Sequence, residues 1–227
     1  MAVLRLARPP VNALDLELVQ AISSGVTDAV ESGARALVVT AAGSCFSAGI
    51  DMKVAPTYDA GQRRESVEAI NTMVAVICSA PLPVVAAVNG HAFGGGLVIA
   101  LACDLRVAAK GDYKLALNEV AAGVPFPPGP LALVRAELDP SVVRDLCLTG
   151  RSVGPEEALA LRLLDEIVEA QELLRRARER VLELAAFPAY PVLKAQVRGP
   201  LTAELKQIAP KATAPARAPR RPSGTPR

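Results

Sequence analysis

The chain has 227 residues, of which 51% are hydrophobic, 21% are charged and only 3% are aromatic. This length can bury an aliphatic core in one large domain, or in one domain with an appendage. The net charge of +2 comes from the end of the chain, where Lys211, Arg217, Arg220, Arg221 and Arg227 occur without an acidic residue. Because the rest is slightly acidic, the charge gives no argument for nucleic-acid binding.

The first half of the chain alternates β-branched strands with longer helices, as judged from the spacing of its apolar residues. The predicted strands are Val3–Leu6, Arg35–Ala41, a run from Pro83 that reaches Asn89, Leu105–Ala109 and Tyr113–Leu117. The predicted helices between them are Leu14–Val30, Gln62–Ser79 and Gly95–Cys103. This alternation predicts an α/β fold with a right-handed parallel arrangement.

The pattern becomes helical after residue 128. Pro155 with the acidic Glu156 and Glu157 is typical of a helix start, and further helices are predicted at Glu169–Ala185 and Val192–Gln207. From Lys211 onward the composition of Pro, Ala and Arg cannot bury a core and predicts disorder. We therefore divide the chain into a core at 1–165, a helical region at 166–209 and a disordered basic tail at 210–227.

The cysteines indicate the compartment. Cys45, Cys78, Cys103 and Cys147 are widely spaced, with no C-x-x-C pair and no Cys/His cluster. This spacing predicts no metal site and favours buried thiols in a reducing cytoplasm. The sequence also shows no signal-peptide pattern and no apolar run of about 18 residues, so we expect a cytoplasmic protein that does not span a membrane.

Two glycine-bearing loops follow two of the predicted strands. They are Phe46–Asp51 and Asn89–Gly96, and the second contains Gly94-Gly95-Gly96. Glycine lets a backbone approach a ligand closely because it has no Cβ. Two such loops at the ends of neighbouring strands can direct two backbone N–H groups at one oxygen. The pattern therefore predicts an oxyanion hole.

These loops stand within a longer series of motifs. The series runs through the Arg8–Leu14 segment, the two glycine loops, Cys103-Asp104, Leu117-Asn118-Glu119, Thr149-Gly150-Arg151, Glu156-Glu157-Ala158 and Leu164-Asp165. In order and spacing it resembles the crotonase (enoyl-CoA hydratase/isomerase) superfamily. The resemblance implies a ββα spiral core and a C-terminal α-helical region through which members form trimers or dimers of trimers. It also implies an acyl-CoA thioester as substrate, with no cofactor.

The resemblance assigns roles to individual residues. The backbone N–H groups of Ile50 and Gly95 would form the oxyanion hole, and Glu119 matches the catalytic glutamate. The Ser47–Ile50 loop, which includes Ala48, would bind the adenine of CoA through its backbone. Lys53 and Lys194 are candidates for contacts with the CoA phosphates.

Val98 separates the possible reactions. Hydratases of the family carry a second glutamate at this position, because hydration needs one group to activate water and another to protonate carbon. Moving a double bond from C3–C4 to C2–C3 needs only one base. An apolar Val98 therefore favours the isomerase, and Leu117-Asn118-Glu119 looks like the 3,2-trans-enoyl-CoA isomerase.

Two alternatives stay open, namely an enoyl-CoA hydratase and an inactive acyl-CoA-binding subunit. A second acid would have to come from Glu65 or Glu68 on the predicted helix after the first loop. His91 has no neighbouring serine nucleophile in a G-x-S-x-G pattern and is interpreted as a loop residue. Asp51 and Asp104 are interpreted as structural. The Phe126–Pro130 stretch replaces a glycine-rich segment of the family.

Overall fold

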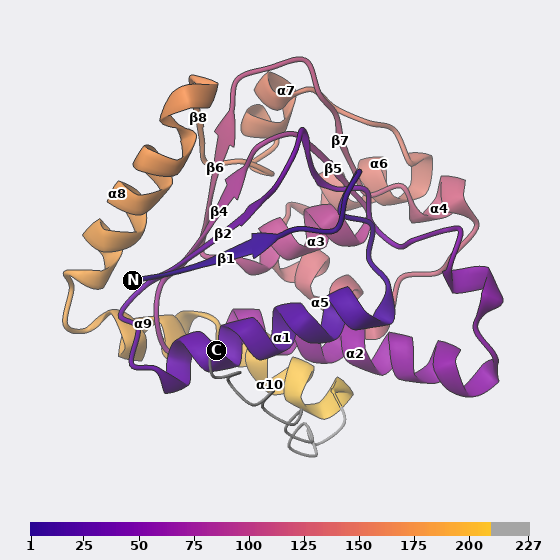
Figure 1. Ribbon diagram of the computed structural model, residues 1–227, viewed down its shortest axis with the longest axis horizontal. Coiled ribbons are helices and arrows are strands. Elements are labelled where there is room, and N and C mark those ends of the chain that lie inside the picture. Colours follow the sequence, from indigo (N-terminus) through magenta and orange to yellow (C-terminus); the bar gives the residue numbers. More distant parts are fainter. Residues whose placement is uncertain (210–227) are drawn as a thin grey trace, which may run out of the picture.

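The main sheet has five parallel strands. The computed structural model describes residues 1–209, and the predicted basic tail at 210–227 lies outside the described residues (Figure 1). The strand order is β1-β2-β4-β6-β8, and the strands are β1 (Ala2–Leu6), β2 (Leu37–Ala41), β4 (Val84–Val88), β6 (Leu105–Ala109) and β8 (Glu166–Val168). The predicted parallel α/β class is therefore confirmed.

A smaller parallel sheet continues from the carboxyl end of the main one. Its order is β3-β5-β7, with β3 (Cys45–Ser47), β5 (His91–Phe93) and β7 (Leu115–Ala116). The strands β3 and β5 each follow a strand of the main sheet by a few residues. The two predicted glycine loops therefore pass through this small sheet.

Both faces of the main sheet are buried, because alternate side chains of each strand point to opposite faces. One face contributes residues such as Val38, Val85 and Val107, which pack against α8 (Leu173–Ala185) through Ala177 and Val181. Figure 1 shows α8 along the left side of the sheet. The helix thus closes this face of the core.

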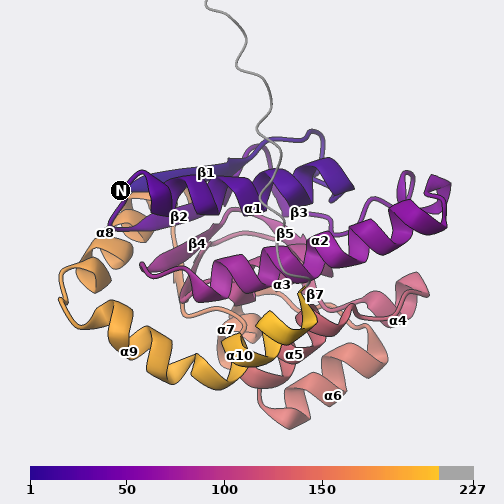
Figure 2. The ribbon, with the colours of Figure 1, turned by 90° about the horizontal axis from the view of Figure 1, so that it is seen from below.

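The opposite face carries most of the helices. They are α1 (Leu16–Glu31), α2 (Ala60–Ser79), α3 (Gly95–Ala102), α5 (Pro128–Glu137) and α10 (Gly199–Ile208). Figure 2 shows α10 next to α5, with α9 (Tyr190–Val197) leading to it from α8. The remaining helices are η1 (Ala55–Thr57), α4 (Glu119–Ala122), α6 (Pro140–Thr149), α7 (Pro155–Ala160) and η2 (Ala170–Glu172).

Helix starts follow local chemistry. Asp15 caps α1 by accepting a hydrogen bond from Leu18 N at 2.8 Å. Asp59 and Gln62 form a reciprocal capping box at the start of α2. Such caps satisfy N–H groups that the helix itself leaves without partners.

Four predicted elements need correction. The predicted loop Phe46–Asp51 begins within the strand β3, and the predicted loop Asn89–Gly96 contains the strand β5. The region 166–209 begins with β8, a strand of the main sheet that pairs with β6. The single helix predicted at Val192–Gln207 is two helices, with α10 starting at Gly199. Pro200 has no N–H to donate and therefore cannot continue α9.

Among residues 1–209, no helix has both the length and the apolar character that crossing a membrane requires. In the same part of the chain, no group of three metal-ligating side chains comes together. All four cysteines are free thiols, and Cys45, Cys78 and Cys103 are buried.

Candidate active site

The two glycine loops meet at the carboxyl end of the sheets. Gly49 has a φ of 77°, and a Cβ atom at this position would lie 2.6 Å from Phe93 O and 3.4 Å from Gly95 N. Similarly, a Cβ on Gly96 would lie 2.4 Å from Ser47 O. Only glycine permits such close packing of backbone on backbone. The structure thus brings Ile50 and Gly95, which the sequence predicted as partners, to neighbouring positions.

Both predicted oxyanion donors have uncommitted N–H groups. Among the described residues, neither Ile50 N nor Gly95 N donates to an acceptor, whereas Gly94 N is bonded to Ala116 O at 2.8 Å. Gly95 is the first residue of α3, whose N-terminal N–H groups have no partner within the helix. The positive end of the helix dipole adds to the attraction for a developing negative charge.

Glu119 lies directly beside this pair of loops. It opens α4 and is 7% exposed. A Cβ on Gly94 would lie 3.2 Å from Glu119 Oε1, so the glycine leaves the room that the carboxyl group occupies. The other oxygen, Oε2, is buried without a hydrogen-bond partner within residues 1–209. An unpaired buried carboxyl oxygen is costly and is typical of a group that awaits a ligand.

The environment of Glu119 favours its neutral form. Burial raises the pKa of this carboxyl group to about 7, against a smaller lowering by its own backbone N–H. A general base is most effective when its pKa lies near the working pH. Burial, together with the charge of Glu119, also raises the pKa of the Cys147 thiol to about 11, so this thiol on α6 is protonated at neutral pH.

Val98 is 1% exposed on α3. Its side chain belongs to the main apolar core. Glu65 and Glu68, the predicted sources of a second acid, are both exposed on α2, and Glu65 accepts a hydrogen bond from Gln20. Among residues 1–209, the structure therefore places one buried carboxyl group, that of Glu119, at the two glycine loops.

The remaining loop residues have definite partners. The Ser47 hydroxyl is fully buried and donates to Asn12 O at 2.8 Å, and Ala48 N donates to Val11 O at 3.0 Å. The hydroxyl and this N–H thus fix the loop from within the protein, and the contact of its backbone with adenine stays a prediction. Lys53 is exposed two residues after Asp51, which caps the loop by accepting from Lys53 N at 3.0 Å.

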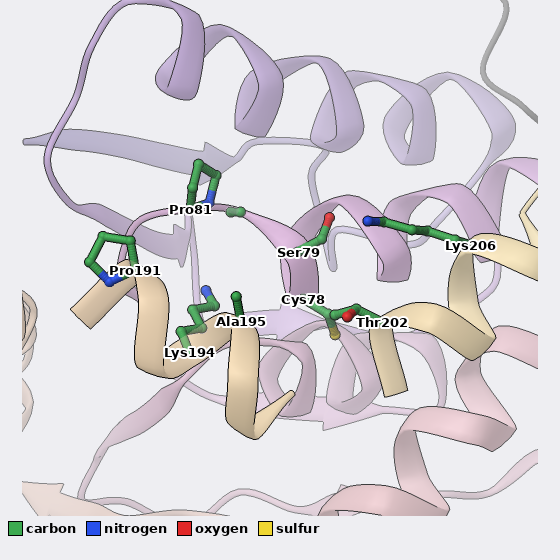
Figure 3. Close-up of a pocket in the computed structure, with 9 residues that line it drawn as sticks. Cys78, Ser79, Pro81, Pro191, Lys194, Ala195, Thr202 and Lys206 are labelled. Carbon is green, nitrogen blue, oxygen red and sulfur yellow. The ribbon is translucent and has the colours of Figure 1, made fainter. Parts of the chain in front are cut away.

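Lys194 is the predicted site residue that the structure does not bring to the loops. It is buried, and its Nζ donates to Leu82 O at 3.0 Å and to Asp104 Oδ2 at 2.8 Å. Leu82 and Asp104 precede β4 and β6, so Lys194 lies at the amino end of the sheet, away from Glu119. Figure 3 shows it beside a cavity of about 120 Å³ between the end of α2 and helices α9 and α10. We do not retain Lys194 as a CoA contact.

The ring of His91 is held by contacts within the protein. It lies on β5, where its ring stacks on Phe93 with centroids 5.6 Å apart. Its Nδ1 accepts a hydrogen bond from Lys114 N at 3.1 Å. The interpretation of His91 as a loop residue is therefore wrong, because β5 is a strand of the small sheet. Asn12, by contrast, is buried next to the first loop and was missed, although it is part of the Arg8–Leu14 motif.

Comparisons with known proteins identify relatives of this chain. The family model described as enoyl-CoA hydratase/isomerase matches residues 1–213. The probable enoyl-CoA hydratase EchA17 of Mycobacterium tuberculosis is 35% identical over 178 residues, which cover 76% of this chain and 66% of that protein. The chain thus spans just under two thirds of the length of that relative.

Solved structures give the same result. EchA3 from Mycobacterium tuberculosis superposes with a TM-score of 0.85 at 28% identity, covering 91% of this chain and 88% of that one. This protein is described as a probable enoyl-CoA hydratase in one structure and as an enoyl-CoA isomerase in another. The human mitochondrial delta3-delta2-enoyl-CoA isomerase, with a TM-score of 0.80 at 24% identity and covering 89% and 83% of the two chains, shares the fold.

Proposed function

This chain belongs to the enoyl-CoA hydratase/isomerase family, and we propose that it shifts the double bond of a 3-enoyl-CoA to the 2-trans position. The observation that carries this proposal is the combination of one buried carboxyl group, Glu119, with an apolar side chain at Val98. The crotonase fold, shared with the solved relatives, supplies the acyl-CoA framework.

In the proposed reaction, the Glu119 carboxylate removes a proton from C2 of the acyl chain. The electrons move into the thioester carbonyl and give a dienolate, whose oxygen accepts hydrogen bonds from Ile50 N and Gly95 N. Glu119 then returns the proton to C4, and the C2–C3 double bond forms as the carbonyl is restored. Because only a proton moves, this reaction requires no cofactor. The donors act best in a site closed to water, where charge stabilisation is strongest.

Hydratase activity is the second candidate, because EchA17 is named as a probable enoyl-CoA hydratase and EchA3 of Mycobacterium ulcerans as an enoyl-CoA hydratase. Addition of water across a C2–C3 double bond needs an acid and a base at the same substrate. Glu119 can supply one of them. Glu65 and Glu68 would have to move inward from their exposed positions to supply the other.

The assembly and compartment are also proposals. The α9 segment exposes Val192, Leu193 and Val197, at 60%, 55% and 79%, and Phe187 just before it is 63% exposed. An exposed apolar face of this kind is typical of an interface, and it supports a homotrimer or dimer of trimers. Four free thiols fit a reducing compartment such as the cytoplasm.

The test is to measure isomerisation of 3-hexenoyl-CoA and hydration of crotonyl-CoA side by side. The wild type should isomerise far faster than it hydrates. Val98→Glu should raise the ratio of hydration to isomerisation, because two nearby acids shift one pKa upward and leave one proton to share. Burial of the new carboxyl group at a position that is 1% exposed should cost about 1–3 kcal/mol of stability. Wild-type hydration as fast as isomerisation would favour the hydratase.

A further inference from the structure

We propose that Asn12 is a positioning residue that orients the Ile50 N–H of the oxyanion hole through the turn Arg8–Leu14. The inference rests on the proposed function, because it concerns the same pair of donors. It assigns a role to a segment that lies before the first helix and does not itself reach the reacting atoms.

The side chain of Asn12 is fully used inside the protein. It is 1% exposed, its Nδ2 donates to Ala42 O at 2.9 Å and to Cys45 O at 2.8 Å, and its Oδ1 accepts from Arg8 N at 2.8 Å. Ala42 and Cys45 flank the connection between β2 and β3. One amide group therefore joins the turn to the strand that leads into the oxyanion loop. A fully satisfied buried polar group of this kind specifies one arrangement of the segments that it joins.

Asn12 also has an unusual backbone conformation. Its φ is 50°, in the left-handed region that asparagine tolerates better than most residues. This conformation turns the Asn12 carbonyl toward the Ser47 hydroxyl, which donates to it at 2.8 Å. The same hydroxyl accepts from Gly49 N at 3.2 Å. The turn is thereby linked to the residue directly before Ile50.

The orientation of Ile50 N–H then follows from peptide geometry. Leu14 N donates to Gly49 O at 2.7 Å, and Asp51 N donates to Leu14 O at 2.9 Å. The Gly49 carbonyl and the Ile50 N–H share one planar trans peptide and point in opposite directions. Fixing the carbonyl against Leu14 therefore directs the Ile50 N–H away from the turn, which leaves it available to a ligand.

Ion pairs at the surface also stabilise the turn Arg8–Leu14. The Arg8 guanidinium lies 2.8 Å from Asp51 Oδ2 and 2.9 Å from Asp15 Oδ2. Burial opposes ionisation of Asp51, but hydrogen bonds from Lys53 N and Arg8 hold its pKa below the usual range. Arg8 is a third exposed, so this pair contributes less than the buried amide.

The experiment compares Asn12→Gly with the wild type. Glycine accepts a φ of 50° without strain, so the variant removes the buried side chain and its hydrogen bonds without straining the backbone. The first readout is the carbonyl stretching frequency of bound hexanoyl-CoA labelled with ¹³C at C1. This saturated thioester has no double bond to move, so its signal reports the donors without turnover.

We expect the carbonyl band to be lowered on binding to the wild type and to return toward the free value in Asn12→Gly. With 3-hexenoyl-CoA, kcat should fall by about 100-fold while KM changes far less, as for a misplaced catalytic group. The matched control is Thr40→Val. It removes another buried side-chain hydrogen bond, from Thr40 Oγ1 to Ala87 O at 3.1 Å, on β2. This control should lose stability but keep the lowered carbonyl band.

Ser47→Ala provides a second variant that cuts the same path at the hydroxyl, and it decides the question if Asn12→Gly does not fold. An unchanged carbonyl band in the folded variants, or an equal band shift in Thr40→Val, would overturn the positioning role. A lowered band in a wild type that does not isomerise 3-hexenoyl-CoA would overturn the proposed function and leave the role of Asn12 standing. A wild-type band at the free value would overturn that role.

Discussion

The two ends of the main sheet differ in whether their buried polar groups have partners. At the amino end, Lys194 lies 2.8 Å from Asp104, and Arg198 lies 3.1 Å from Glu137. At the carboxyl end, Glu119 has a buried oxygen without a partner, and two backbone N–H groups of the glycine loops are uncommitted within the described residues. The buried charges at the amino end are thus paired within the protein, whereas the polar groups at the carboxyl end are free to bind a ligand.

Helix α3 connects the two ends and shows what the difference means. Its first turn, at Gly95, is open toward the site, whereas the carbonyls of Ala102 and Cys103 at its last turn accept from Arg198 at 2.7 Å and 3.0 Å. The C-terminal helices thus stabilise the fold from the amino end, whereas Glu119 Oε2 and the two uncommitted N–H groups lie at the end where chemistry is proposed. Functional sites generally carry such local costs, which the rest of the structure offsets.

The largest expected effect comes from Glu119→Gln at the carboxyl end. Turnover should fall by about two to four orders of magnitude, because the amide cannot accept the C2 proton. The stability of the protein, by contrast, should be higher in Glu119→Gln than in the wild type at about pH 8. The carboxyl group has a pKa of about 7 when folded against 4.5 in the reference state, so the folded protein holds a proton that the unfolded chain loses as pH rises between these values.

This raised pKa means that the wild type loses stability from about pH 4.5 to about pH 7, by at most about 3 kcal/mol, and is then constant. Glu119→Gln should lack this loss and be the more stable protein at about pH 8. Urea unfolding of both proteins at low and high pH measures this difference in stability. If stability depended on pH equally in the two proteins, that result would contradict a raised pKa of Glu119 in the folded protein.

Asp104→Ala should have the largest effect at the amino end. It leaves Lys194 buried without its carboxylate and removes one of the two carboxylates beside Arg198, which should cost about 3–5 kcal/mol of stability. The kcat of the folded fraction should change little, because Asp104 lies at the far end of the sheet from Glu119. Denaturant unfolding and steady-state kinetics on the same samples separate the two effects. A kcat that falls as in Glu119→Gln would show that the two ends are not independent.

Gly49→Ala should have a smaller effect on stability, of about 1–3 kcal/mol, from its φ of 77° and the contact of its Cβ with Phe93 O. Gly33→Ala is the matched control, since Gly33 has a φ of 73° but nothing within 4 Å of its Cβ position. Both variants carry the backbone strain, and only Gly49→Ala should displace the loop and lower kcat. Equal activity of the two variants would remove the close approach of the loops from the account.

Much of this architecture could be predicted from the sequence. Buried β-branched runs such as Val84–Val88 and the helix at Gly95 were readable because burial on both faces leaves a continuous apolar pattern. The strands β3, β5 and β8 were missed because three residues are too few to show a period. The break between α9 and α10 was signalled by Gly199-Pro200 but was hidden by the apolar spacing on either side.

The positions of the candidate site residues could be predicted where sequence motifs define them. They could not be predicted where contacts between residues far apart in the sequence define them. Ile50, Gly95 and Glu119 stand in sequence motifs and are neighbours in the structure. Lys194 could not be distinguished from a ligand-binding lysine, because its partner Asp104 lies 90 residues away. Asn12 was overlooked for the same reason, since its contacts with Ala42 and Cys45 cross from the first turn to the second strand.

The central claim is that one carboxyl group, Glu119, carries the proton at the unpaired end of the sheet. Its most direct test is the pH dependence of kcat/KM for 3-hexenoyl-CoA from about pH 5 to about pH 9, which reports the essential groups of the free enzyme. A single base predicts activity that rises through one ionisation near the Glu119 pKa of about 7 and then stays level. A bell-shaped profile, with a second group that must stay protonated, would contradict the account.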